Sequence, residues 1–184
     1  MCYSRYIFGY TLYHHPSKPL NNEGPLPLLG EFVKLSIDGI VDVGSKPKVE
    51  REAIASGHIF LCSKSMEAIT EGLSPKGDIM EASTIAAIQA VKETSRILPH
   101  CHPIPIEGCS VDWEILDEKL CCTVSVRTHW TTGVEMEALS GVSAGLLCAW
   151  DMLKSFEKDE YGQYPETRIQ EIRVISKKKR DQQS

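Results

Sequence analysis

The chain lacks a long apolar run and has no excess of positive charge. Among its 184 residues, no hydrophobic stretch approaches the roughly 20 residues that a membrane-spanning helix needs. The formal net charge is −5, whereas general nucleic-acid binders normally carry a basic excess. We therefore expect neither a membrane nor a nucleic acid as a partner, and the length favours one domain with a sizeable core.

A secretion signal and a regular cysteine pattern are also missing. The N-terminal segment does not have the compact apolar core and small-residue cleavage site of a signal peptide. The seven cysteines are odd in number and irregularly spaced, which is not typical of a disulfide framework. We expect reduced, mostly buried thiols and a cytoplasmic protein.

The ends of the chain differ in composition from its middle. Residues 1–39 are rich in proline, asparagine and glycine, which predicts a poorly ordered or atypical extension. Its early aromatic residues allow a short strand or an adhesive arm instead. The domain itself is expected over residues 40–176. Residues 177–184 carry a run of three lysines and an arginine and are predicted to be a solvated basic tail.

Hydrophobic periodicity predicts the order of elements within the domain. We expect a strand over 49–62, a helix capped by Ser63 and closed by Gly72, a helix over 79–97, a hairpin of strands 104–115 and 120–128, a helix over 134–156 and a strand over 168–175. This order predicts an α+β fold of the ferredoxin-like split β-α-β type, an antiparallel sheet with helices packed on one face.

The helix over 134–156 carries two stripes at helical spacing. One is large and apolar and should face the sheet. The other has small residues in its middle and charges at its ends; its members are Glu137, Ser140, Ala144, Leu147, Asp151 and Lys154. It is either a solvated face with an ordinary ion pair or a surface that a ligand or another backbone approaches. Two glycines, each costing a helix about 1 kcal/mol, favour close approach. We expect this stripe to place Asp151 and Lys154 beside Glu137.

Two polar segments are predicted to form the walls of one site. In the first, His100, Cys101 and His102 are held between prolines. Zinc is one interpretation, but alternate residues of an extended chain point to opposite faces, and no second ligand pair follows. A histidine that binds a substrate phosphate or base is the better functional interpretation, with a structural role as the alternative for His100. In the second segment, Glu135 and Glu137 open the helix, where the helix dipole alone would also favour acids.

Cations for an anionic substrate are scattered along the chain. Lys76 lies in a Ser-Pro-Lys-Gly-Asp loop and Arg51 on the first predicted strand of the domain. The sequence has no Gly-x-x-x-x-Gly-Lys-Ser/Thr phosphate-binding loop. Phosphate recognition would therefore need separate side chains that the fold brings together, and each cation taken singly is typical of a surface charge.

Taken together, these segments resemble the molybdenum cofactor biosynthesis protein C family over residues 40–175, with features of its archaeal branch. The resemblance depends on strings that occur in the family's order: Val41-Asp42-Val43-Gly44-Ser45-Lys46, Lys76-Gly77-Asp78, Ile88-Gln89-Ala90-Val91-Lys92, Leu98-Pro99-His100-Cys101-His102-Pro103, Thr132-Gly133-Val134-Glu135-Met136-Glu137-Ala138-Leu139 and Trp150-Asp151-Met152-Leu153-Lys154.

The resemblance implies a reaction and an assembly. Family members convert (8S)-3′,8-cyclo-7,8-dihydroguanosine 5′-triphosphate, which a radical enzyme supplies, to cyclic pyranopterin monophosphate with release of pyrophosphate. The resemblance implies no redox step, cofactor or metal, so proton transfer and charge neutralisation must carry the reaction. It also implies a homo-oligomer, a hexamer built as a trimer of dimers, with sites at subunit interfaces.

The resemblance further implies roles for individual residues. Asp151 and Lys154 would form the catalytic acid–base pair. Substrate-binding residues would be His100, Cys101, His102, Glu135, Met136, Glu137, Lys76 and Arg51. Of these, we expect Lys76, Arg51 and His102 to meet phosphates. The two glutamates would contact the guanine-derived ring or orient Lys154.

Two departures from the family pattern affect phosphate binding. Thr84 stands where bacterial members carry an arginine, and the usual C-terminal Gly-Gly-Lys-Ser-Gly is replaced by lysines. Two alternatives to a lyase remain: a nucleotide-binding regulatory protein on the same scaffold that does not turn over substrate, and a metal-dependent enzyme that uses His100, Cys101 and His102.

Overall fold

The computed structural model describes residues 5–7, 10–12 and 39–180. The chain divides into two compact units, Met1–Ile37 and Asp38–Ser184. In the first unit, strands β1 (Arg5–Ile7) and β2 (Tyr10–Leu12) pair antiparallel, with Arg5 opposite Leu12. The predicted extension over 1–39 thus contains a short hairpin, and most of its other residues lie outside the described part.

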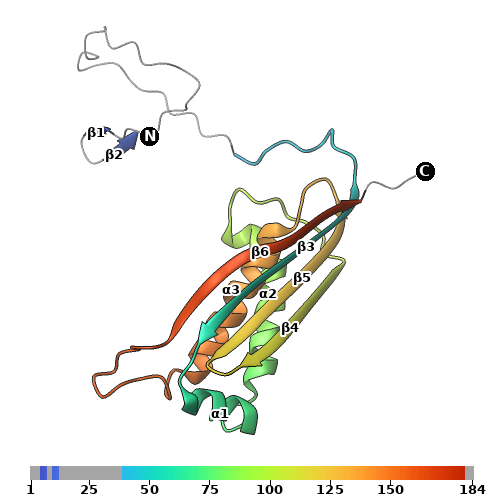
Figure 1. The fold of residues 1–184 in the computed structure, drawn as a ribbon. Helices are drawn as coiled ribbons and strands as arrows, with labels where there is room; N and C mark the ends of the chain where they lie inside the picture. Colours follow the sequence, from blue (N-terminus) through green and yellow to red (C-terminus); the bar gives the residue numbers. More distant parts are fainter. Residues whose placement is uncertain (1–4, 8–9, 13–38, 181–184) are drawn as a thin grey trace. The chain divides into compact units, whose positions relative to one another are not determined.

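The second unit is a four-stranded antiparallel sheet with two long helices on one face (Figure 1). Its elements are β3 (Val49–Phe60), α1 (Ser63–Glu71), α2 (Ile79–Ile97), β4 (Gly108–Leu116), β5 (Lys119–Trp130), α3 (Glu135–Leu153) and β6 (Arg168–Arg180). The strand order across the sheet is β4-β5-β3-β6. The predicted α+β class is therefore confirmed.

Glycines let α3 approach its neighbours closely. A Cβ added to Gly141 would lie 2.8 Å from a methyl carbon of Val91 on α2 and 3.1 Å from one of Val124 on β5. A Cβ on Gly145 would lie 3.2 Å from the Trp113 ring on β4. The close approach expected from the glycines is therefore found inside the chain, where the core of α3, α2 and the sheet meets.

The last strand is longer than predicted. It runs through Lys177 to Arg180 and pairs with β3, with Glu50 opposite Arg180. The predicted strand ended at Ile175, so the basic run that the sequence places in a solvated tail belongs to the sheet. β6 contains a bulge, because Glu171 has a φ of 53° and the register with β3 shifts between Ser56 and His58.

The start of α1 depends on a carboxylate far along the chain. Ser63 was the predicted N-cap, but Cys62 occupies that position and its side chain caps no backbone N–H. The Cys62 amide instead donates to Glu157 Oε1 at 3.0 Å, and Thr167 donates its hydroxyl to the other oxygen of Glu157. At the end of α1, Gly72 adopts the left-handed conformation as predicted, with a φ of 68°.

Candidate functional site

The two polar segments predicted to face each other do line one cavity. Its volume is about 420 Å³. The predicted site residues that line it are His100, Cys101, His102, Glu135, Met136 and Glu137. Val41, Val43 and Lys46, from the segment before β3, complete the wall. We call this the front cavity.

Both histidines fasten the segment before β3 onto the front cavity. His100 Nδ1 lies 2.9 Å from the Gly39 carbonyl oxygen, and His102 Nε2 lies 2.7 Å from that of Val41. Because a carbonyl oxygen only accepts hydrogen bonds, each of these ring nitrogens carries a proton. His100 thus has the kind of hydrogen bond that its structural alternative requires, and its role toward a substrate stays a prediction.

Three groups around the first turn of α3 differ in their electrostatics. Glu137 is only 3% exposed, and burial, together with the nearby charge of Glu135, raises the pKa of its carboxyl group. Burial and the neighbouring Glu137 also raise the pKa of the Cys101 thiol. Glu135 instead forms an ion pair with Lys177 of β6. Sequence reasoning missed Lys177, because a run of lysines shows no alternation that would mark a strand.

A second cluster gathers around Asp151 near the end of α3. Lys76 Nζ lies 2.6 Å from one carboxylate oxygen of Asp151, and Lys154 Nζ lies 2.7 Å from the other. Hydrogen bonds from Lys154 and Lys76 lower the pKa of Asp151 to about 2. The same contact raises the pKa of Lys154. The structure thus adds Lys76, from the loop before α2, to the predicted pair.

The two clusters do not meet within one chain. Glu137 and Asp151 lie near opposite ends of α3, and at 1.5 Å per residue their separation along the helix axis is about 21 Å. The expectation that the helix stripe places Asp151 and Lys154 beside Glu137 is therefore wrong for a single subunit. Helical spacing puts these residues on one face, but it does not bring its two ends together.

Two further predicted positions have structural partners. The Arg51 guanidinium donates to the carbonyl oxygens of Trp130 and Thr131, each at 3.1 Å, and so holds the turn between β5 and α3. Arg51 does not line the front cavity. Thr84 accepts a hydrogen bond of 2.9 Å from the indole N–H of Trp113, which fastens α2 to β4.

The described residues offer neither a metal site nor a membrane-spanning helix. No three histidine, cysteine or acidic side chains there come together in a way that would hold a metal ion. None of the helices described is long and apolar enough to cross a membrane.

Fold and clusters together define a class of protein. It is a small α+β protein whose cavity offers imidazole, thiol and carboxyl groups, with a separate cluster of two ammonium groups around one carboxylate. Such groups suit acid–base chemistry on a small anionic molecule. The model of the MoaC family matches residues 40–180, and the chain belongs to this family.

Several relatives are similar to this chain over most of their length. A protein of Methanothermobacter thermautotrophicus, named probable cyclic pyranopterin monophosphate synthase accessory protein, is 49% identical over 83% of this chain and 97% of its own. Proteins of Thermococcus kodakarensis and Methanoregula boonei, each named probable cyclic pyranopterin monophosphate synthase, are also 49% identical. They cover 76% and 81% of this chain and 90% and 97% of their own.

Proposed function

We propose that the protein is a cyclic pyranopterin monophosphate synthase of molybdenum cofactor biosynthesis. This lyase converts (8S)-3′,8-cyclo-7,8-dihydroguanosine 5′-triphosphate to cyclic pyranopterin monophosphate and pyrophosphate. The observation that carries the proposal is the front cavity, where the histidine segment meets the first turn of α3. The names of relatives that are 49% identical support the same reaction.

The pKa directions suggest how the acid–base roles divide. Asp151 raises the pKa of Lys154, so Lys154 stays protonated at neutral pH; it would give its proton only to a strongly basic substrate group and otherwise stabilises negative charge. Asp151, with a pKa of about 2, is a weak base at neutral pH and instead holds Lys154 and Lys76 toward the triphosphate. Glu137, whose pKa is raised, is better suited to accept and return protons.

The working site is proposed to combine two subunits. The stripe between the clusters contains Ser140, Ala144 and Leu147, and Leu147 is 58% exposed. Two α3 helices packed antiparallel across a two-fold axis along this stripe would bring the Asp151 cluster of one copy toward the front cavity of the other. We propose a hexamer, a trimer of such dimers, as the family resemblance implies. Arg51 then acts on substrate through the turn that it holds.

We also propose a ferredoxin-like arrangement of the sheet and a cytoplasmic location for the protein. The chain order β3, helices, β4, β5, α3, β6 and the sheet order β4-β5-β3-β6 support a ferredoxin-like arrangement. The cysteines of the described part, from Cys62 to Cys148, are free thiols, which suits a reducing compartment such as the cytoplasm. The substrate would come from the radical enzyme of the same biosynthesis.

A turnover assay tests the proposal. Purified protein is incubated with the cyclic GTP-derived substrate, and pyrophosphate and pterin product are measured together. We expect both products in equal amounts. Tight binding of the substrate without either product would instead identify a nucleotide-binding regulatory protein. Activity that disappears on exhaustive chelation and returns with metal would identify a metal-dependent enzyme.

A further inference from the structure

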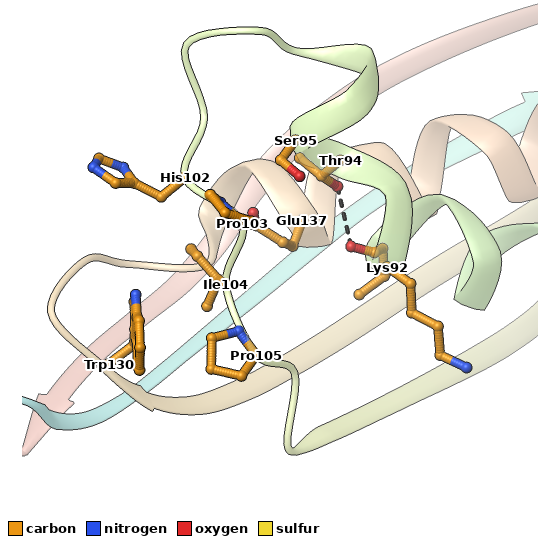
Figure 2. Close-up of a pocket in the computed structure, with 10 residues that line it drawn as sticks. Lys92, Thr94, Ser95, His102, Pro103, Ile104, Pro105, Trp130 and Glu137 are labelled. Carbon is orange, nitrogen blue, oxygen red and sulfur yellow. Dashed lines mark hydrogen bonds between the residues drawn. The ribbon is translucent and has the colours of Figure 1, made fainter. Parts of the chain in front are cut away.

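A second cavity lies behind the segment that carries the histidines (Figure 2). Its volume is about 430 Å³, and it lies between that segment and the C-terminal half of α2. Lys92, Thr94 and Ser95 line it from α2, and Pro103, Pro105 and Trp130 line it from the opposite side. We call it the rear cavity.

Glu137 belongs to both cavities. The front and rear cavities share only three lining residues among those described, which are His102, Ile104 and Glu137. In Figure 2 the Glu137 side chain lies between Pro103 and Thr94, whereas the His102 ring points away from them. His102 already uses Nε2 on the Val41 carbonyl oxygen. Among the residues described, Glu137 is therefore the one with a carboxyl group that lines both the front and the rear cavity.

The rear cavity suits water. A water molecule occupies about 30 Å³ in the liquid, so a space of this size holds several. Ser95 and Lys92 line it, and in Figure 2 the Lys92 ammonium group points away from Glu137. The Thr94 hydroxyl already donates a hydrogen bond of 3.0 Å to the Ala90 carbonyl oxygen. Of the two hydroxyl-bearing residues that line the cavity, Ser95 is therefore the better hydrogen-bond partner for water.

We propose that the rear cavity is the proton outlet of the active site and that Glu137 connects it to the substrate. The inference rests on the proposed function. The Glu137 carboxylate takes a proton from a substrate N–H or O–H group, whose electron pair stays on the substrate. The new carboxyl O–H then releases that proton to water in the rear cavity, which restores the carboxylate. No electron is gained or lost overall.

The need for an outlet follows from burial. Glu137 is only 3% exposed, and a substrate in the front cavity would cover its remaining access on that side. The titratable groups beside it are Glu135 on the same helix and Cys101 on the segment that carries the histidines, whereas the His102 ring points away from it (Figure 2). The rear cavity lets Glu137 exchange its proton while the substrate is bound.

Filling the rear cavity tests this proposal. Ser95→Leu adds an apolar side chain on the cavity wall and leaves every residue of the front cavity unchanged. We expect kcat to fall about tenfold or more with little change in KM, because a positioned proton transfer contributes roughly 10²–10⁴-fold to a rate. The solvent deuterium isotope effect on kcat should increase as proton release becomes limiting.

Matched controls separate this effect from damage to the fold. Arg96→Leu adds a leucine on the solvent side of the same turn, where the side chain is 82% exposed, and should keep the wild-type kcat and isotope effect. Ser95→Ala removes the hydroxyl without filling the space, so it should lower kcat less than Ser95→Leu does. If Ser95→Leu does not fold, Ser95→Val fills less space and serves in its place. A folded filling variant with the wild-type kcat and isotope effect overturns the proposal, whereas wild-type protein without turnover overturns the proposed function and this inference with it.

Discussion

Two acids on the same helix have opposite electrostatic surroundings, and this decides which of them can move protons. Asp151 lies between two ammonium groups, which lower its pKa to about 2. Glu137 is buried beside another acid, which raises its pKa. Residue type alone predicts the same behaviour for both. Both positions were predicted as site residues from the sequence, but the direction of each shift depends on neighbours that only the fold supplies.

The lowered pKa of Asp151 predicts a pH dependence. A carboxyl whose folded-state pKa lies below its unfolded value of about 3.9 contributes stability above that value and loses it as pH falls toward 2. Asp151→Asn should therefore lower Tm slightly at pH 7, with the difference disappearing between about pH 4 and pH 2. The effect should be small because this cluster is exposed. Thermal unfolding at several pH values measures it, with exposed Asp112→Asn as the control. A difference that persists at pH 2 would contradict the assigned pKa.

The bounds of helices and strands could be predicted from the sequence where neighbouring residues give a clear periodic pattern. The bounds of α2, Ile79–Ile97, were predicted from the helical period, and the structure adds an N-cap, because Asp78 accepts a hydrogen bond of 2.8 Å from the Glu81 amide. The β4–β5 hairpin was also predicted, although its strands begin and end a few residues away from the predicted positions. The end of β6 was not, because pairing with the acids of β3 stabilises its lysines there: Lys178 Nζ lies 2.9 Å from Glu52 Oε2.

The close packing of α3 predicts the effect of filling one glycine. Gly141→Ala gains about 1 kcal/mol of helix propensity, but its Cβ would lie 2.8 Å from Val91, and overpacking of this kind costs roughly 1–3 kcal/mol. We expect a net loss of about 1 kcal/mol in the free energy of unfolding. Urea denaturation measures it, with Ser140→Ala on the same helix as the control. An unchanged or more stable Gly141→Ala protein would show that Val91 moves aside at no cost.

Replacing Glu157 should lower the free energy of unfolding more than Gly141→Ala does. Glu157 is 6% exposed, and its carboxylate joins the start of α1 to the loop before β6 through Cys62 and Thr167. Glu157→Ala leaves the Cys62 amide and the Thr167 hydroxyl without this partner, so the free energy of unfolding should fall by about 1–3 kcal/mol. Exposed Glu160→Ala in the same loop should change it little. Equal stability of the two variants would mean that water replaces the carboxylate without cost.

At the scale of the molecule, the candidate residues named from the sequence lie in two separate clusters, and the sequence did not predict this division. Helical spacing predicts Glu137, Asp151 and Lys154 on one stripe of α3, but Glu137 is 3% exposed, whereas the side chains of Asp151 and Lys154 are 57% and 46% exposed. Only the folded chain shows that the front cavity forms around the first turn, while Lys76 gathers with the other two residues at the far end. Because about 21 Å separates the clusters along the axis, a second copy is the simplest way to complete the site.

Subunit mixing tests this arrangement. Glu137→Gln should inactivate the front cavity of the chain that carries it. Asp151→Asn should inactivate the Asp151 cluster that its chain contributes to a neighbouring subunit. Each variant alone should therefore be inactive. If every site takes its cavity from one chain and its cluster from another, random assembly of equal amounts restores both intact parts at about a quarter of the sites. Coexpression with two different tags, followed by purification on both, yields mixed oligomers for the turnover assay. Mixing Asp151→Asn with Lys154→Ala is the control and should restore nothing, because both changes fall in the same cluster. Mixed oligomers of the first pair that remain inactive, with both tags present, would place the whole site within one chain.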